Sequence, residues 1–129
     1  MPSWNEIKDY ANSKYTLNKD EDTYFSIVFG YDDDRSQQIM VRNFQVNDEE
    51  WVEYRTFICA EADLNTRVAL RKNEELLVGA LALDKDGDYC LLHNARLATL
   101  DLEEFEQPLH SLARSADQIE EEHTGKDDY

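Results

Sequence analysis

Three alternating aspartates, at positions 84, 86 and 88, come nearest to a ligand-binding pattern in this sequence. Alternating acids open the calcium-binding loop of EF-hands, which also needs glycine at its sixth position and glutamate at its twelfth. Tyr89 and Ala95 occupy those two positions here, and the flanking segments are apolar and strand-like. The pattern therefore favours a hairpin turn around Gly87, because Asp and Gly tolerate the positive φ of short hairpin loops.

The other residues with catalytic or metal-binding side chains show no recognisable arrangement. His93, His110 and His123 have no ligand spacing with one another or with cysteine, and the acidic runs at 20–22 and 32–34 are typical of solvated turns. The sequence contains no G-x-S-x-G elbow, phosphate loop or dinucleotide fingerprint. We therefore predict a protein that is not an enzyme and holds no cofactor or specific metal ion. A small acidic enzyme or ligand-binding domain with an unrecognised site is the alternative.

The two cysteines also lack a reactive pattern. Cys59 and Cys90 lie inside apolar segments and have no C-x-x-C spacing. Free cysteine is usually buried and behaves as a small hydrophobic residue. We predict two reduced, buried thiols, with a disulfide or redox pair as the alternative.

Length and charge exclude several classes of partner. The chain has 129 residues, 41% of them hydrophobic, with 29 acidic against 13 basic residues and a net charge of −16. Such a protein is repelled by nucleic acid and by anionic membranes, so neither is an expected partner. The start has no signal-peptide pattern, and the longest apolar run, Leu76–Leu83, is far shorter than the ~20 residues of a membrane span. We expect a cytoplasmic protein.

The first half of the chain predicts a helix and three strands. Ser3 and Glu6 have the spacing of a capping box, which begins a short helix that ends near Ser13 and buries Trp4, Ile7 and Ala11. A polar connection at 18–22 follows. Alternating apolar residues then predict strands at 23–29, 36–46 and 51–60, joined by short polar turns as an antiparallel meander.

The second half predicts a helix, a hairpin and a longer helix. Asp63 is the expected N-cap of a helix that ends at Asn73, and the hairpin strands follow over 76–83 and up to Leu97. Thr99 or Asp101 begins the last helix, in which Pro108 is expected to introduce a kink or divide off the first turn. This helix has a heptad-like apolar stripe, which favours packing across a sheet over a coiled coil: Leu102, Phe105, Leu109, Leu112, Ala116 and Ile119.

These elements predict one α+β domain over 1–122 and a disordered acidic tail over 123–129. The order α-β-β-β-α-β-β-α predicts a single five-stranded antiparallel sheet, with the first and last helices on one face. The apolar run at 76–83 has hydrophobic residues on both faces of the predicted strand, so both faces need to be covered.

The element order and several motifs resemble the type III secretion chaperone-like fold, and within it the YbjN-type group of bacterial sensory transduction regulators. The meander before residue 60 agrees only in layout. The more specific motifs are Arg71-Lys72-Asn73-Glu74-Glu75-Leu76, the glycine at 79, the turn at 86–88, Leu91-Leu92-His93 and Ala116-Asp117. The resemblance implies a small non-enzymatic protein that binds other proteins in a regulatory or chaperone-like role, usually as a homodimer. A true secretion chaperone for an effector is the alternative within this fold.

A dimer surface is predicted around the middle helix. The surplus apolar surface there comprises Leu64, Val68, Leu70, Leu76 and Val78. A symmetric pairing through this helix and the neighbouring strand would bury it. Residues 51–100 carry 8 acidic and 6 basic residues, so this region is also the least repelled by a second copy.

Overall fold

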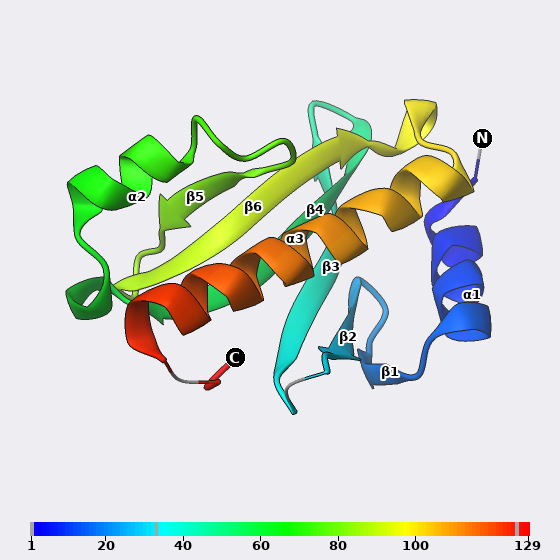
Figure 1. Cartoon of the computed structure of the whole chain (residues 1–129). Coiled ribbons are helices and arrows are strands. Elements are labelled where there is room, and N and C mark those ends of the chain that lie inside the picture. Colours follow the sequence, from blue (N-terminus) through cyan, green and yellow to red (C-terminus); the bar gives the residue numbers. More distant parts are fainter. Residues whose placement is uncertain (1, 33, 126) are drawn as a thin grey trace.

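The computed structural model describes residues 2–32, 34–125 and 127–129. Its helices and strands follow one another along the chain (Figure 1), and two single-turn 3-10 helices, η1 and η2, separate some of them. Their bounds are α1 Trp4–Lys14, β1 Leu17–Asp20, β2 Tyr24–Gly30, β3 Ser36–Val46, β4 Glu49–Ala60, η1 Glu61–Asp63, α2 Thr66–Lys72, β5 Ala80–Leu83, β6 Asp88–Arg96, η2 Leu97–Thr99 and α3 Leu102–Thr124.

The sheet is antiparallel and has six strands in the order β1-β2-β3-β4-β6-β5. The prediction of five strands was wrong because β1 lies where the sequence predicted only a polar connection. β1 is a short edge strand that pairs with β2 alone, and three of its four residues are exposed. An exposed edge strand needs no apolar alternation, so its sequence carries no strand signal.

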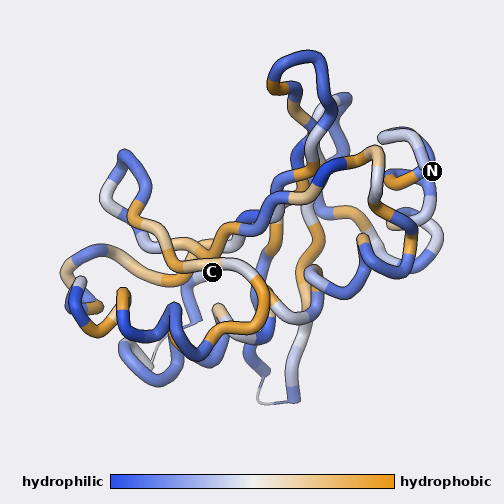
Figure 2. The backbone as a smooth tube through the Cα atoms, turned by 90° about the horizontal axis from the view of Figure 1, so that it is seen from above, coloured by the Kyte–Doolittle hydropathy of each residue, from blue (hydrophilic) through white to orange (hydrophobic). Residues whose placement is uncertain are grey.

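Helices α1 and α3 lie on the same face of the sheet, as predicted (Figure 1). The core between them and the strands is fully buried at Ile7, Phe25, Tyr54 and Leu109, and the Tyr54 hydroxyl donates to the Phe105 carbonyl at 2.9 Å. β4 shows the expected alternation, with Val52, Tyr54, Thr56 and Ile58 buried and the residues between them half-buried. Figure 2, which is coloured by hydropathy, shows hydrophilic residues along several of the projecting loops.

Both predicted capping boxes are present. The Ser3 hydroxyl accepts from the Glu6 amide at 3.2 Å, and the Asp101 carboxylate accepts from the Glu104 amide at 2.7 Å. The stripe of α3 packs on the sheet, and it is buried from Phe105 to Ile119. Pro108 is buried within α3 and does not divide the helix. None of the helices in the described ranges is long and apolar enough to cross a membrane.

The region between β4 and β5 differs most from the expectation. Asp63 ends η1, and Asn65 caps α2 instead, its side chain accepting from the Arg67 and Val68 amides. The predicted strand over 76–83 is shorter, because β5 begins only at Ala80. Gly79 has a φ of +77°, which turns the chain out of the extended conformation before the strand starts.

The hairpin between β5 and β6 is confirmed, and its aspartates serve the turn. One carboxylate oxygen of Asp84 accepts from the amides of Asp86 and Asp88, both at 2.9 Å. An aspartate that binds backbone amides two and four residues ahead stabilises a turn without any bound cation. The alternating acids are thus explained by the hairpin.

The two cysteines are free and buried, as predicted. Burial raises the pKa of the Cys59 thiol to about 11 and also raises the pKa of Cys90. Both thiols are therefore protonated at neutral pH and unreactive as nucleophiles.

The chain's end lies against the sheet. α3 continues to Thr124 and is capped by Gly125 in the left-handed conformation. The Tyr129 carbonyl accepts from the Gln38 amide at 2.9 Å, and the Tyr129 ring packs on Phe57. The sequence predicted a disordered tail from residue 123, whereas residues 127–129 make these contacts in the structure.

Candidate protein-binding surfaces

Exposed apolar side chains gather in the segment from α2 to β5. Leu70 on α2 is 70% exposed, and Leu77 in the following loop is fully exposed at 100%. Val68 and Leu83 are also exposed, and α2 lies beside β5 (Figure 1). We name these four residues the α2–β5 corner. Large apolar side chains this exposed mark a surface suited to another protein.

The five residues predicted for the dimer surface divide between this corner and the core. Val68 and Leu70 are exposed and belong to the corner, whereas Leu64 is buried and anchors the start of α2. Leu76 and Val78 are half-buried and pack against the core. Their alternation leaves Leu77 pointing outward.

The sequence analysis missed Leu77 and Leu83 as surface residues. Both fall in the apolar run at 76–83, which was interpreted as a strand covered on both faces. The signal that could have located them is Gly79, since a glycine with positive φ ends the strand pattern and leaves the residues before it in a loop.

β5 adds a backbone feature to the corner. It is the edge strand of the sheet and pairs only with β6, and its Leu81 amide donates to the Asn73 side chain at 2.6 Å. Edge strands offer a template for pairing with another chain. The corner therefore combines apolar side chains with a short edge strand, one amide of which is already bonded to Asn73.

A surface hollow of about 520 Å³ borders the corner. It lies between the loop at Leu77, the end of β6 and the first turns of α3, and it is lined by Val78, Ala95, Leu100 and Pro108 among others. His93 also lines it; burial lowers the pKa of this histidine, and its ring packs edge-on against Tyr54. The hollow adjoins Leu77 and mixes these apolar side chains with polar ones such as Arg96 and Glu104.

The sheet face opposite the helices is the second surface. Met40, Phe44, Trp51 and Phe57 are half-buried there. The Glu53 carboxylate pairs with Arg42 at 3.1 Å and with Arg55 at 3.1 Å across the same face. This face is therefore wetter than the core face, and its charges at Arg42, Glu53 and Arg55 are already paired.

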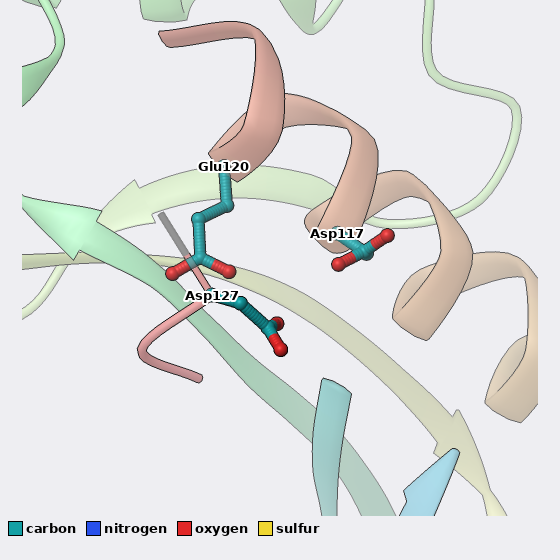
Figure 3. Close-up of side chains that lie close together, drawn as sticks. All are labelled: Asp117, Glu120 and Asp127. Carbon is teal, nitrogen blue, oxygen red and sulfur yellow. The ribbon is translucent and has the colours of Figure 1, made fainter. Parts of the chain in front are cut away.

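A third cluster joins the end of α3 to the start of β3. The Arg35 guanidinium lies 3.0 Å from Asp117, 3.4 Å from Glu120, 3.2 Å from Glu121 and 3.9 Å from Asp127. Figure 3 shows Glu120 and Asp127 approaching each other, with Asp117 one turn earlier on the helix. Burial raises the pKa of Glu120.

Asp117, Glu120 and Asp127 place carboxylate oxygens within 4.8 Å of one another, which is the spacing of a cation site. Arg35 supplies the positive charge at this point, so the cluster is explained as an ion-pair network. The sequence did not predict this cluster, because Asp117 and Glu120 lie on α3, Asp127 follows it, and Arg35 is more than 80 positions away in the chain.

A fourth cluster connects α1 to α3 through hydrogen bonds. The Glu106 carboxylate accepts from the Tyr10 hydroxyl at 2.7 Å, from the Tyr15 hydroxyl and from Lys14 at 3.1 Å. These donors, Tyr10 first, lower the pKa of Glu106 to about 2. Tyr15 also contacts His110 Nε2 at 2.7 Å. With both tyrosine protons engaged by a carboxylate, the group stabilises a helix pair and offers no free base.

No protein-family model matches this sequence, and no curated protein is similar to it. Solved structures do share its fold. A chain of the HopA1–SchA chaperone–effector complex aligns with a TM-score of 0.64 at 15% identity, covering 89% of this chain and 90% of that chain. A chain of the ExsC–ExsE complex aligns with a TM-score of 0.60 at 16% identity, covering 91% of this chain and 89% of that chain.

At these identities the likeness establishes the fold alone. It confirms the α+β architecture that the resemblance to the type III secretion chaperone-like fold implied, apart from the additional strand β1. The assignment to the YbjN-type group within that fold stays a prediction.

Proposed function

We propose that this protein is a non-enzymatic, cytoplasmic protein-binding module with a regulatory or chaperone-like role. The observation that carries the proposal is the α2–β5 corner, where Leu70 and Leu77 are exposed beside an edge strand. The shared fold supports it, because one of the similar structures is a chaperone bound to its effector. The polar clusters at Arg35 and Glu106 are each explained by contacts that hold the fold together. The exposed apolar surface of the corner is therefore the feature that we assign to protein binding.

Within this fold, a regulator of the YbjN type is favoured over a secretion chaperone for an effector. An effector segment that wraps a chaperone needs apolar patches on the sheet as well as on the helices. The open sheet face here is crossed by the Arg42–Glu53–Arg55 ion pairs, and a partner that covered it would have to desolvate them. A binding mode confined to the corner avoids this cost.

We further propose that the protein forms a homodimer through the α2–β5 corner. A two-fold axis would bring each copy's Leu70 and Leu77 against the same surface of its partner. An interface of ~1,600 Å² in total would suffice for a stable dimer. Arg67, Arg71 and Lys72 lie on α2 and offset the acidic residues Glu74 and Glu75 that follow it, so this region adds little to the repulsion between two chains of charge −16.

Site-specific photo-crosslinking in the source cell tests the protein-binding proposal. A benzophenone amino acid at position 77 should give discrete crosslinked species, including one that contains a second, different protein. The matched control places the same group at Val46, which is also exposed but lies at the far end of β3. Equal, diffuse crosslinking from both positions would argue against a specific surface at the corner.

A further inference from the structure

Strands β3 and β4 separate at one end of their ladder. Backbone pairing runs from Val46 opposite Glu49 to Met40 opposite Arg55. Beyond that pair, β4 continues to Ala60 alongside β6, and residues 36–39 continue alongside β2. We name the space between 36–39 of β3 and 56–59 of β4 the β3–β4 slot.

In this slot, side-chain hydrogen bonds connect β3 to β4 in place of the backbone hydrogen bonds of a continuous ladder. The Gln37 amide nitrogen donates to the Thr56 hydroxyl at 2.8 Å and to the Phe57 carbonyl at 2.6 Å. The Thr56 hydroxyl donates to the Gln38 carbonyl at 2.7 Å. Gln37 and Thr56 are both buried, so the separation of the two strands is built into the core.

The chain's last residues occupy the slot. The Ser36 amide donates to the Asp127 carboxylate at 3.0 Å, and the Gln38 amide donates to the Tyr129 carbonyl at 2.9 Å. These two amides are two residues apart on β3, the period with which a strand presents donors to a neighbour on one side. The Tyr129 ring packs on Phe57, with 6.3 Å between ring centroids. The segment thus satisfies the β3 donors that β4 leaves unpaired.

The Asp128 amide also holds this segment by donating to the Glu120 carboxylate at 2.8 Å, whereas the ion pair of Asp127 is weak. Asp127 is the fourth carboxylate around the single guanidinium of Arg35, and its distance of 3.9 Å is the longest of the four. Its neighbours Asp117 and Glu120 repel it. Tyr129 remains exposed, and a hollow of about 280 Å³ beside it is lined by Lys19, Arg55 and Phe57. A competing acidic segment would find the Phe57 ring and the Lys19 side chain there, whereas Arg55 is already paired with Glu53.

We propose that the β3–β4 slot is a binding site for an extended acidic peptide segment with an aromatic residue, and that residues 127–129 are an internal occupant which a partner's segment displaces. Such a segment adds to a strand through backbone bonds and gains specificity from one or two side chains. The inference rests on the proposed protein-binding function, because the displacing segment belongs to a protein partner. It places a second contact away from the α2–β5 corner.

The test uses the full chain carrying Asp127→Ala, Asp128→Pro and Tyr129→Ala, which removes the side-chain contacts and the Asp128 amide bond of this segment, with a synthetic peptide of residues 124–129 as the probe. Backbone amide NMR reports the Ser36 and Gln38 signals directly. In this variant both amides should shift on titration with the peptide, and the peptide should bind at least about fivefold more tightly than to the wild type, where the slot is occupied. A peptide of scrambled sequence and the single variant Asp9→Ala on α1 serve as controls.

Two outcomes would overturn the proposal. Equal binding to wild type and variant would show that residues 127–129 do not occupy the slot, and no shift at Ser36 or Gln38 in the variant would show that there is no peptide site. The wild type gives an independent check, since its Gln38 amide should exchange with solvent more slowly than in the variant. Because the probe is a peptide and the readout is at β3, failure here is distinguishable from failure to find a partner at the α2–β5 corner.

Discussion

At the scale of single residues, the polar side chains of this protein are organised by carboxylates that accept several donors. Asp84 accepts two turn amides, Glu106 accepts two tyrosine hydroxyls and a lysine, and Glu120 accepts the Asp128 amide while it faces Arg35. Each arrangement provides hydrogen-bond acceptors that stabilise a helix or a turn. None leaves a free nucleophile beside a base, which is why these groups support structure in our account.

Glu106 yields a prediction about stability and pH. Its pKa of about 2 in the folded state lies below its ordinary value of 4.5, so it stabilises the fold above pH 4.5 and loses that contribution as the pH falls toward 2. Glu106→Gln should lower the free energy of unfolding by about 1–2 kcal/mol at pH 7, because an uncharged acceptor replaces a carboxylate.

Urea denaturation at pH 7 and at several lower values measures this effect. The difference between wild type and Glu106→Gln should shrink as the pH falls below 4.5. Glu103→Gln, an exposed position on the same helix, is the matched control and should leave stability nearly unchanged. A difference that stayed constant down to pH 2 would contradict the assigned role of the carboxylate.

At the scale of elements, the local conformation of the segment from α2 to β5 determines which of its apolar side chains are exposed. Asn65 fixes the start of α2, and the Asn73 side chain accepts from the Leu81 amide at 2.6 Å, which connects the end of α2 to β5. Gly79 has no side chain, so the backbone can lie directly against Leu92 and Leu112. The exposed position of Leu77 follows from these three anchors.

Gly79→Ala tests that explanation. An added Cβ would lie 2.6 Å from Leu112 Cδ2 and 2.8 Å from the Leu92 carbonyl oxygen, in addition to the strain of a φ of +77°. Gly87→Ala is the matched control, because its φ of +84° carries the same backbone strain but nothing lies within 4 Å. The control should cost about 1–2 kcal/mol.

Gly79→Ala should destabilise the protein more than Gly87→Ala in thermal or urea unfolding. Equal losses would mean that the close approach to Leu92 and Leu112 is unimportant, and that the loop at 76–79 is not held as described.

The elements that sequence reasoning recovered are those with a strong local signal. The capping boxes at Ser3 and Asp101 and the apolar stripe of α3 predicted both long helices, because one buried face repeats with the helical period. β1 was missed because an exposed edge strand needs no pattern. The strand predicted over 76–83 was too long because a continuous apolar run does not reveal which residues are buried and which are exposed for binding.

The candidate sites were predicted less completely than the fold. Val68 and Leu70 were assigned to a surface and are exposed, but Leu64 is in the core. The β3–β4 slot depends on contacts between residues more than 90 positions apart, such as Ser36 with Asp127. Such contacts leave no periodicity in a single sequence, so they emerge only from the folded chain.

At the scale of the whole molecule, the charge and the apolar surface are separated. The net charge of −16 keeps two copies apart over most of their surfaces, whereas the α2–β5 corner presents Leu70 and Leu77 beside the edge strand β5. Association of a strongly charged protein is least opposed where large apolar side chains are exposed, and Leu70 and Leu77 are the most exposed of these. We therefore expect two copies of the chain to associate through the α2–β5 corner.

Sedimentation velocity at micromolar concentration tests this expectation by comparing the wild type, Leu70→Asp and the control Val46→Asp. Circular dichroism confirms that each protein is folded. We predict a dimer of the 15.1 kDa chain for the wild type and for Val46→Asp, and a folded monomer for Leu70→Asp, because a buried aspartate at the seam would lose its hydration. A monomeric wild type, or a dimer that Leu70→Asp leaves intact, would contradict the account.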